Sequence, residues 1–294
     1  MTTKPFVSII IRTLNEEKEL PITLKNIHLQ KFKYLYEIII VDSGSSDNTL
    51  KIAKQYNCKI LKIDSKNFSY SYALNMGAEN SKGELLIFLS AHCSPVNKNW
   101  LKYITSQLLL NKKVGAVFGR ELPKKGVNPV YEYSQLYEMF PPKNNTSVIF
   151  SNANSCIKKE IWKKIPFDES LTRKRGFLLI GEDALWAEAI KMEGYEIIYE
   201  PLAIVYHSHK FKVKEFTRAY SAGYFSKELP SMSPINQKRR LLRIFIYAKK
   251  QFSILFYLIK NNYYKSIFWD FPLSIVLTNF FYFLGKKDRE SETF

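Results

Sequence analysis

The sequence predicts an α/β protein built on a doubly wound, mostly parallel sheet. Short apolar runs that are typical of buried strands alternate with amphipathic segments that are typical of helices. This alternation is the pattern of consecutive β-α-β units. Polar clusters follow the ends of several apolar runs, and open α/β sheets bind their ligands at the carboxyl ends of the strands. The fold class therefore also indicates where a site is expected.

Four strands are expected in the first third of the chain, because four apolar runs are each bounded by polar or turn-forming residues. These runs are 6–11, 37–41, 59–63 and 84–89. Helices are expected between them, and in the first of these Leu20, Leu24 and Ile27 recur at helical spacing. The predicted helices are 20–30, a helix after the polar turn 43–49, and 69–80.

The second part of the chain continues the pattern less regularly. A helix near 100–110 and a strand at 114–118 precede a stretch rich in Tyr, Pro and Asn. Further helices and strands are expected beyond residue 147. They are a short strand within 148–157, a helix near 159–164, a helix that 181–183 opens and that runs to about 192, strands at 196–199 and 203–206, and a basic helix near 213–227.

The charge of the chain predicts an anionic partner. Lys and Arg number 44 against 27 Asp and Glu, a formal net charge of +17. Nucleic acid, an anionic membrane surface and a phosphorylated substrate all fit such a charge. The chain contains no recognisable nucleic-acid reading module, so a nucleic-acid partner is not expected.

The cysteines predict a reducing compartment. The three cysteines are widely spaced and form no C-x-x-C pair, so neither a disulfide framework nor a zinc ribbon is indicated. The first residues lack the long apolar core of a signal peptide. We therefore expect a cytoplasmic location.

The composition changes near residue 230, which divides the chain into a predicted catalytic domain, 1–229, and a basic, aromatic helical segment, 230–294. The most apolar part, 266–284, is interrupted by Asp270, Pro272 and Asn279, whereas a spanning helix needs about 20 apolar residues. The segment is therefore expected to lie on an anionic membrane as a peripheral anchor. The alternative is a helical subdomain that packs on the rest of the protein.

Five polar clusters lie at predicted strand or helix ends, where the site is expected. They are 12–16, 42–47, 90–92, 182–183 and 207–209. No G-x-G-x-x-G sequence or P-loop follows any predicted strand. The sequence therefore argues against a Rossmann dehydrogenase and against a P-loop nucleotidase.

Five stretches in order resemble the motifs of the family 2 glycosyltransferases with a GT-A fold. They are VSIIIRTLNE at 7–16, IVDSGSSDNT at 40–49, ALNMG at 73–77, FLSAH at 88–92 and GED at 181–183. The likeness covers about residues 6–225. It implies transfer of a sugar from a nucleotide-diphosphate donor to an acceptor hydroxyl, usually with inversion.

In finer detail the chain resembles the rhamnosyltransferase-like branch of this family. The stretches that carry this likeness are 68–75, 90–92 and 207–209. It implies elongation of a bacterial surface glycan, such as lipopolysaccharide or capsule, on a free or lipid-linked glycan acceptor. The donor sugar does not follow from the likeness.

By this resemblance, seven residues are expected to bind the nucleotide sugar. They are Thr13, Asn15, Glu16, Asp42, Asn75, Ser90 and His92. A carboxylate such as that of Asp42 accepts a hydrogen bond from a pyrimidine N3–H, and short polar side chains reach a ribose. The alternative for Asp42 is that it only forms the turn that follows its strand.

The fourth motif departs from the family pattern. The family usually carries Asp-x-Asp there, which holds a divalent metal on the diphosphate, whereas this chain has Ser90-Ala91-His92. His92 is a candidate ligand for Mn²⁺ or Mg²⁺, completed by His207 or His209. Imidazole suits Mn²⁺ better than Mg²⁺, which prefers oxygen. The alternative is a metal-independent enzyme in which His92 contacts the diphosphate or sugar directly.

The resemblance also assigns the general base to Asp183, with Glu182 as a contributor. Single displacement at an anomeric carbon needs a base that takes the acceptor proton. The alternative is that both carboxylates merely favour a helix N-terminus.

Two other classes of function stay open at this point. A catalytically inactive GT-A scaffold is suggested by the absent Asp-x-Asp. A nucleotidyltransferase is less favoured, because it would need a glycine-rich loop after the first strand and residues 12–17 contain no glycine.

Overall fold

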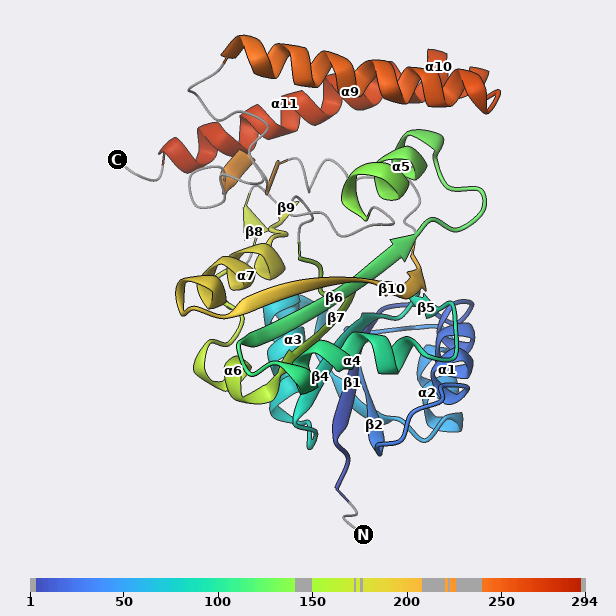
Figure 1. Ribbon diagram of the computed structural model, residues 1–294, viewed down its shortest axis with the longest axis vertical. Helices are drawn as coiled ribbons and strands as arrows, with labels where there is room; N and C mark the ends of the chain where they lie inside the picture. The colour runs from blue at the N-terminus through green and yellow to red at the C-terminus, as the bar shows by residue number, and fades with distance from the viewer. Residues whose placement is uncertain are drawn as a thin grey trace. The chain divides into compact units, whose positions relative to one another are not determined.

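The computed structural model describes residues 4–140, 150–171, 173–174, 177–207, 220–221, 223–225 and 240–291 (Figure 1). The chain forms two compact units. The first consists of Met1–Lys124, Met139–Leu171 and Glu182–Ser208, and the second of Lys125–Glu138, Thr172–Gly181 and His209–Phe294. The predicted boundary between residues 229 and 230 lies outside the described residues.

The first unit is built on a sheet in the order β3-β2-β1-β4-β7-β6-β10-β5. Its strands are β1 Val7–Thr13, β2 Tyr36–Asp42, β3 Lys59–Lys62, β4 Leu85–Ser90, β5 Ser94–Pro95, β6 Val114–Leu122, β7 Asn154–Lys158 and β10 Glu196–Tyr206. Strand β7 runs antiparallel to β4 and β6, and β5 runs antiparallel to β10, while the other neighbours are parallel. The predicted doubly wound, mostly parallel sheet is thus confirmed.

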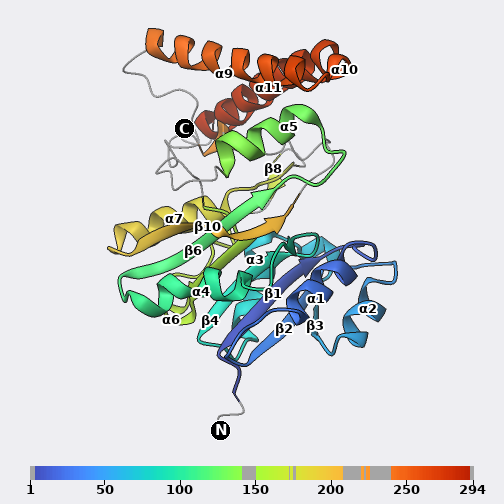
Figure 2. The same cartoon turned by 45° about the vertical axis from the view of Figure 1, so that its right-hand side comes forward.

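Helices cover both faces of this sheet (Figure 2). On one face lie α1 Leu20–His28, α2 Thr49–Gln55 and α4 Trp100–Leu110, and on the other α3 Tyr70–Glu79, α6 Lys159–Lys164 and α7 Glu182–Met192. Because side chains alternate across a strand, Ile9 and Ile11 of β1 join the first hydrophobic cluster, whereas Ile10 joins the second. A short 3₁₀ helix, Ser65–Asn67, precedes α3.

Two predicted strands, 196–199 and 203–206, form the single strand β10. The register against β6 shifts between Glu200 and Val205, which marks an irregularity in one continuous strand. Pro201 lies in this irregular part, where its missing N–H removes one ladder hydrogen bond. The proline therefore interrupts the pairing without ending the strand.

The strand directions bring the predicted polar clusters to one edge of the sheet. Thr13 is the register partner of Asp42, and Arg12 is the partner of Ser90. Strand β6 is parallel to β10 and antiparallel to β7, so the end of β6, the end of β10 and the start of β7 lie at this same edge. We call it the carboxyl edge.

The second unit contains the C-terminal helices. Its described elements are α5 Pro129–Ser134, the strands β8 Arg173–Lys174 and β9 Phe177–Leu178, and the helices α9 Arg240–Lys260, α10 Tyr264–Phe268 and α11 Asp270–Ser291. A short π-helix, Gln135–Met139, follows α5. Two glycines allow close backbone contact in this unit. A Cβ on Gly285 would lie 1.9 Å from the Tyr220 carbonyl oxygen, and a Cβ on Gly223 would lie 1.9 Å from the Tyr282 carbonyl oxygen.

The predicted helical character of the C-terminal segment is confirmed by α9, α10 and α11. Within the described ranges, the structure contains no helix of sufficient length and apolarity to cross a membrane. The predicted basic helix near 213–227 is described only at residues 220–221 and 223–225.

Candidate active site

The loops that follow β1 and β2 are joined by hydrogen bonds. The Asn15 backbone N–H donates to Ser45 Oγ at 2.8 Å, and the Ser46 N–H donates to Asn15 Oδ1 at 2.8 Å. Asn15 has φ +54°, a left-handed conformation that asparagine tolerates better than most residues. The predicted nucleotide-binding residues of these two loops are therefore placed together by the fold.

Asp42 forms the turn that follows β2. Its side chain is buried, and its Oδ2 accepts hydrogen bonds from the N–H groups of Gly44 at 3.1 Å and Ser45 at 3.0 Å. Oδ1 accepts from Ser45 Oγ at 2.5 Å. Asp42 thus stabilises the turn after its strand, as the alternative interpretation predicted. A contact with a nucleotide base stays a prediction.

Thr13 lies beside Asp42 at the end of β1. Its side chain is 5% exposed, and its Oγ1 has no hydrogen-bond partner among the described residues. A buried hydroxyl without a partner costs free energy, so it marks a position where a ligand would supply the missing bond. This observation supports the predicted role of Thr13.

Asn75 is fully engaged within the protein. Its Nδ2 donates to Phe167 O and to Glu169 Oε1, both at 2.8 Å. Its Oδ1 accepts from Trp162 Nε1 at 2.9 Å and from the Phe167 N–H at 3.1 Å. These four bonds use the hydrogen-bonding capacity of the amide, so Asn75 holds the 162–169 segment on α3 rather than offering a free group to a ligand.

Two histidines from distant parts of the chain stack at the carboxyl edge. The rings of His92 and His207 have centroids 5.1 Å apart and an interplanar angle of 23°. His92 Nδ1 donates to Glu16 Oε1 at 2.7 Å, and His207 Nδ1 donates to Glu121 Oε2. The structure therefore places His92 and His207 side by side, with Glu16 bound to His92, whereas His209 lies outside the described residues.

Glu121 is a site residue that the sequence did not reveal. It lies near the end of β6, is 2% exposed, and accepts a hydrogen bond from Ser151 Oγ at 2.9 Å as well as from His207. A glutamate is almost never fully buried unless it is paired. The available signal was a carboxylate three residues after the predicted strand 114–118.

Ser90 occupies the end of β4 between the other groups. Its N–H donates to Ala153 O at 3.2 Å, and its side chain is half-buried. Beside it, Arg12 places its guanidinium 5.0 Å from the centre of the Tyr70 ring. The Ser90 side chain forms a hydrogen bond with Cys93, and a contact with the donor stays a prediction.

Asp183 and Glu182 begin α7. Asp183 Oδ1 accepts from the Ala184 N–H at 2.9 Å, and Oδ2 accepts a long hydrogen bond from the Asn152 N–H at 3.4 Å. Burial raises the pKa of Asp183 to about 7, and the neighbouring Glu182 carboxylate acts in the same direction. The two backbone N–H groups and the Arg12 guanidinium oppose this rise in pKa.

Glu182 is held by Arg12, a residue that the sequence did not single out. The Glu182 side chain is buried, and its Oε1 lies 3.6 Å from Arg12 Nη1. Because Arg12 lies in β1, this ion pair links the start of α7 to that strand. The start of α7 thus supplies one carboxylate with a pKa of about 7, that of Asp183, and a second one, that of Glu182, which pairs with a cation.

Comparisons with known proteins show which sequences this chain is similar to. The family model described as glycosyl transferase family 2 matches residues 8–165. The O-antigen chain rhamnosyltransferase RfbN of Salmonella typhimurium is 29% identical over 237 residues, which cover 74% of this chain and 72% of RfbN. The O-antigen chain rhamnosyltransferase WbaN of Salmonella anatum is also 29% identical. This match covers 64% of this chain and 62% of WbaN, which is less than two thirds of that protein.

A solved structure shares the fold. The mannosyltransferase PcManGT from Pyrobaculum calidifontis, solved in complex with GDP-Man and Mn²⁺, superposes with a TM-score of 0.63. The match covers 98% of this chain and 87% of PcManGT at 18% sequence identity. At this identity the likeness concerns the fold alone.

Proposed function

Because the chain belongs to glycosyl transferase family 2 and is a glycosyltransferase with the GT-A fold, we propose that it extends a bacterial surface glycan. In this proposal a sugar moves with inversion from a nucleotide-diphosphate donor to a hydroxyl of lipopolysaccharide, capsule or a similar glycan, free or lipid-linked. The names of RfbN and WbaN, both O-antigen chain rhamnosyltransferases, support the acceptor class. The GDP-Man held by PcManGT supports the donor class.

The arrangement of Asp183 carries this proposal. An inverting transferase needs one base that removes the acceptor proton while the new bond forms, and the ideal base has a pKa near the working pH. Asp183 meets this requirement, because burial raises its pKa to about 7. Its two backbone hydrogen bonds fix the direction of the carboxylate.

Glu182 acts in this proposal through Asp183. Its carboxylate raises the pKa of Asp183, and its side chain lies 3.6 Å from the Arg12 guanidinium, which holds it in place. Glu182 is thus a positioning residue. The acceptor hydroxyl is activated by Asp183 alone.

The donor is proposed to bind along the ends of β1, β2 and β4. Thr13 offers a buried hydroxyl without a partner, and the joined loops bring Asn15, Glu16 and Asp42 to the same place. Ser90 and His92 follow β4 and are proposed to lie beside the diphosphate. Asn75 supports this region through its four hydrogen bonds.

A divalent metal fits the donor chemistry of the histidine pair. Metal-binding histidines usually donate their second ring N–H to a carboxylate, as His92 does to Glu16 and His207 to Glu121. Within the described residues no group of three or more His, Cys, Asp or Glu side chains is arranged to hold a metal. We propose His92 and His207 as ligands, with His209 as a further candidate and oxygens of the donor completing the shell.

When bound, Mn²⁺ or a similar ion would neutralise charge on the leaving nucleoside diphosphate. The protein's own contribution is to orient the two imidazoles. Glu16 fixes the His92 ring and Glu121 fixes the buried His207 ring, so both side chains are held before a donor arrives. Ser151 in turn fixes Glu121.

The test of the proposed function is a donor screen with the full chain. We expect one class of nucleotide-diphosphate sugar to bind in calorimetry and to release nucleoside diphosphate slowly, with Mn²⁺ increasing the release. NMR of a product formed with an acceptor glycan would then show the inverted anomeric configuration. If no donor binds with or without a divalent metal, the inactive-scaffold alternative is correct.

The C-terminal helices are proposed to hold the enzyme on the cytoplasmic face of the membrane. Large apolar side chains are exposed on them: Phe252, Phe256, Ile259, Tyr264, Phe268, Trp269, Val276, Phe280 and Phe283. Exposed lysines lie among them, at Lys249, Lys260 and Lys265. Aromatic and basic side chains together suit the interface of an anionic bilayer.

Replacing Phe252 and Phe256 together by serine is expected to weaken binding to phosphatidylglycerol vesicles at least tenfold. The two side chains are one turn apart on α9 and are 71% and 68% exposed, so both reach a bilayer at once. Each buried aromatic contributes about 1.5–3 kcal/mol. Vesicle co-sedimentation measures the effect. The matched control is Leu110→Ser with Met192→Ser, which removes two equally exposed side chains of the first unit, and an equal loss in both would contradict the proposal.

A further inference from the structure

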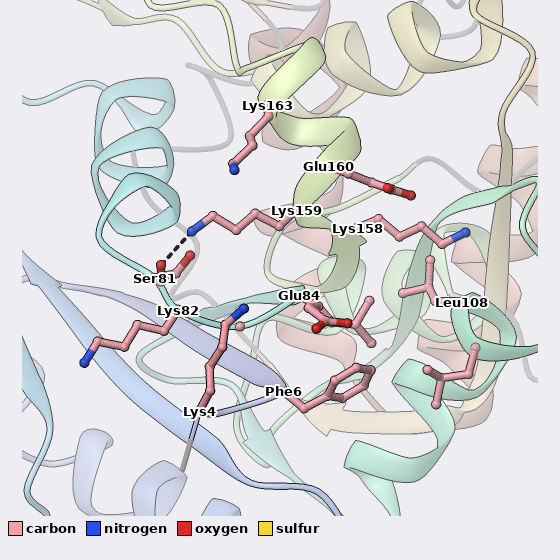
Figure 3. A pocket seen from close by; sticks show the side chains of 13 residues that line it. Lys4, Phe6, Ser81, Lys82, Glu84, Leu108, Lys158, Lys159, Glu160 and Lys163 are labelled. Carbon is pink, nitrogen blue, oxygen red and sulfur yellow. Dashed lines mark hydrogen bonds between the residues drawn. The ribbon is translucent and has the colours of Figure 1, made fainter. Parts of the chain in front are cut away.

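A basic groove lies at the edge of the sheet opposite the carboxyl edge. It has a volume of about 700 Å³ and is surrounded by Lys4, Lys82, Lys158, Lys159 and Lys163 (Figure 3). These lysines come from the residues before β1, the turn before β4, the end of β7 and the helix α6. Since a strand rises about 3.3 Å per residue, the length of β1 separates this groove from Thr13 by roughly 20 Å.

The walls of the groove are fixed by backbone hydrogen bonds. The Glu84 N–H donates to Phe6 O at 2.9 Å, and the Lys159 N–H donates to Glu84 O at 2.9 Å. Lys159 Nζ donates to Ser81 O at 2.6 Å, which ties α6 to the turn before β4. A Cβ on Gly83 would lie 2.5 Å from the Ser8 backbone nitrogen, so this turn packs directly on β1. The groove is therefore formed before any ligand arrives.

The charge in this groove is not balanced by the protein. The groove is lined by five lysines and by Glu84 and Glu160, and Glu37 lies beside it, where its carboxylate accepts a hydrogen bond from the Lys82 N–H at 2.6 Å. Five lysines thus face three glutamates, an excess of two positive charges. Among the described residues none of the five lysines forms an ion pair. Burial lowers the pKa of Lys159, and the neighbouring charges of Lys163, Lys4 and Lys59 lower it further, while the Glu37 carboxylate acts in the opposite direction. The lysines therefore repel one another, and a bound anion would reduce this electrostatic repulsion.

One wall of the groove is apolar. Phe6, Leu108 and Leu109 line it, and in Figure 3 Lys158 extends toward the side on which Leu108 lies, while Lys159 and Lys163 lie on the other side of Glu84. A groove of this volume, with an apolar wall and charged groups, is in the size range of small-molecule sites. The groove is half open, and lysines line it on both sides of Glu84.

We propose that the basic groove is a second ligand site, which binds a small molecule that carries a phosphate or diphosphate group. Lysine ammonium groups are suited to phosphate oxygens as mobile point charges. The apolar wall accommodates the remainder of such a molecule. The site is independent of the catalytic residues, none of which lines the groove.

The test uses the full chain with inorganic pyrophosphate as the probe, followed by hydrogen–deuterium exchange and calorimetry. Exchange locates the binding, because the catalytic edge also has affinity for diphosphate in the proposed function. We expect pyrophosphate to slow exchange in segments 81–85 and 158–163 beyond the effect of sodium chloride at equal ionic strength. The Lys82→Gln, Lys163→Gln double variant is expected to bind at the groove at least tenfold more weakly.

The matched control is the Lys51→Gln, Lys54→Gln double variant, which removes two exposed lysines of α2 and the same charge. It is expected to keep the affinity of the groove within twofold. The proposal is overturned if segments 81–85 and 158–163 gain no protection, or if both double variants lose affinity equally. It is also overturned if phosphatidylglycerol vesicles protect these segments and pyrophosphate does not, since the groove would then face a membrane.

Discussion

The Asp183→Asn variant is expected to transfer sugar about 10³-fold more slowly than the wild type, within the range that loss of a positioned general base produces. Asparagine has the size of aspartate, and its single amide oxygen can keep the shorter of the two backbone hydrogen bonds, from the Ala184 N–H. It has no basicity at any relevant pH, so the acceptor proton has nowhere to go as the new bond forms. Donor affinity is expected to stay within twofold, because Asp183 is proposed to contact the acceptor.

The measurement is kcat for transfer together with the donor Kd from calorimetry. The matched control is Glu182→Gln, which removes the neighbouring carboxylate and keeps the base. Since Glu182 raises the pKa of Asp183, its removal is expected to move the acid limb of the pH–rate profile to lower pH with a smaller change in rate at pH 8. A wild-type rate in the Asp183→Asn variant would contradict the assignment of the base.

The pH dependence follows from the same carboxylate. Asp183 acts as a base only when it is deprotonated, so the wild-type rate is expected to fall tenfold per pH unit below its pKa of about 7 and to be flat above it. The folding stability is expected to change with pH in the opposite direction to the rate. The pKa is raised from 3.8, so the folded state loses stability as pH rises from about 4 to about 7. The asparagine variant should therefore gain thermal stability relative to the wild type across this window.

The fold was largely predictable from the sequence because its signals are local. Buried strands such as β4 are continuous apolar runs, and helices such as α4 and α6 have the bounds that their periodicity predicts. The direction of β7 was not predictable, since the sequence of one strand carries no information about its neighbours in the sheet. The continuity of β10 through Pro201 was also missed, because proline normally ends a strand and here only shifts its register.

The candidate site was predictable where the family motifs name its residues. The resemblance pointed to His92, His207 and Asp183, and the structure places the two histidines in contact. Their supporting groups were not predictable, because they depend on side-chain contacts between distant segments. Glu121 meets His207 across 86 residues, and Asn152 meets Asp183 across 31. Asn75 is the opposite case. The family motif names it as a ligand-binding residue, whereas its side chain forms hydrogen bonds to the protein's own residues 162 and 167.

The His92→Ala variant is expected to lose transfer activity about 10²-fold and to need a higher Mn²⁺ concentration for half-maximal rate. The imidazole is proposed to hold the metal that offsets charge on the leaving diphosphate, a contribution of several kcal/mol. His92 is the better variant of the pair, because His207 is 2% exposed and its removal would leave the buried Glu121 without this partner. The second variant is Glu121→Gln, in which loss of the orienting carboxylate should weaken Mn²⁺ affinity by about 10–100-fold.

The measurement is a Mn²⁺ titration of the transfer rate after treatment with EDTA. His28→Ala is the matched control, because this exposed histidine of α1 contacts only Leu24 O and the Tyr56 ring and should leave the titration unchanged. The experiment separates the two mechanisms that Ser90-Ala91-His92 allows. Wild-type activity that survives EDTA, with a His92→Ala defect confined to donor KM, would mean that the imidazole contacts the diphosphate itself, and that the chain neutralises the leaving group without a metal.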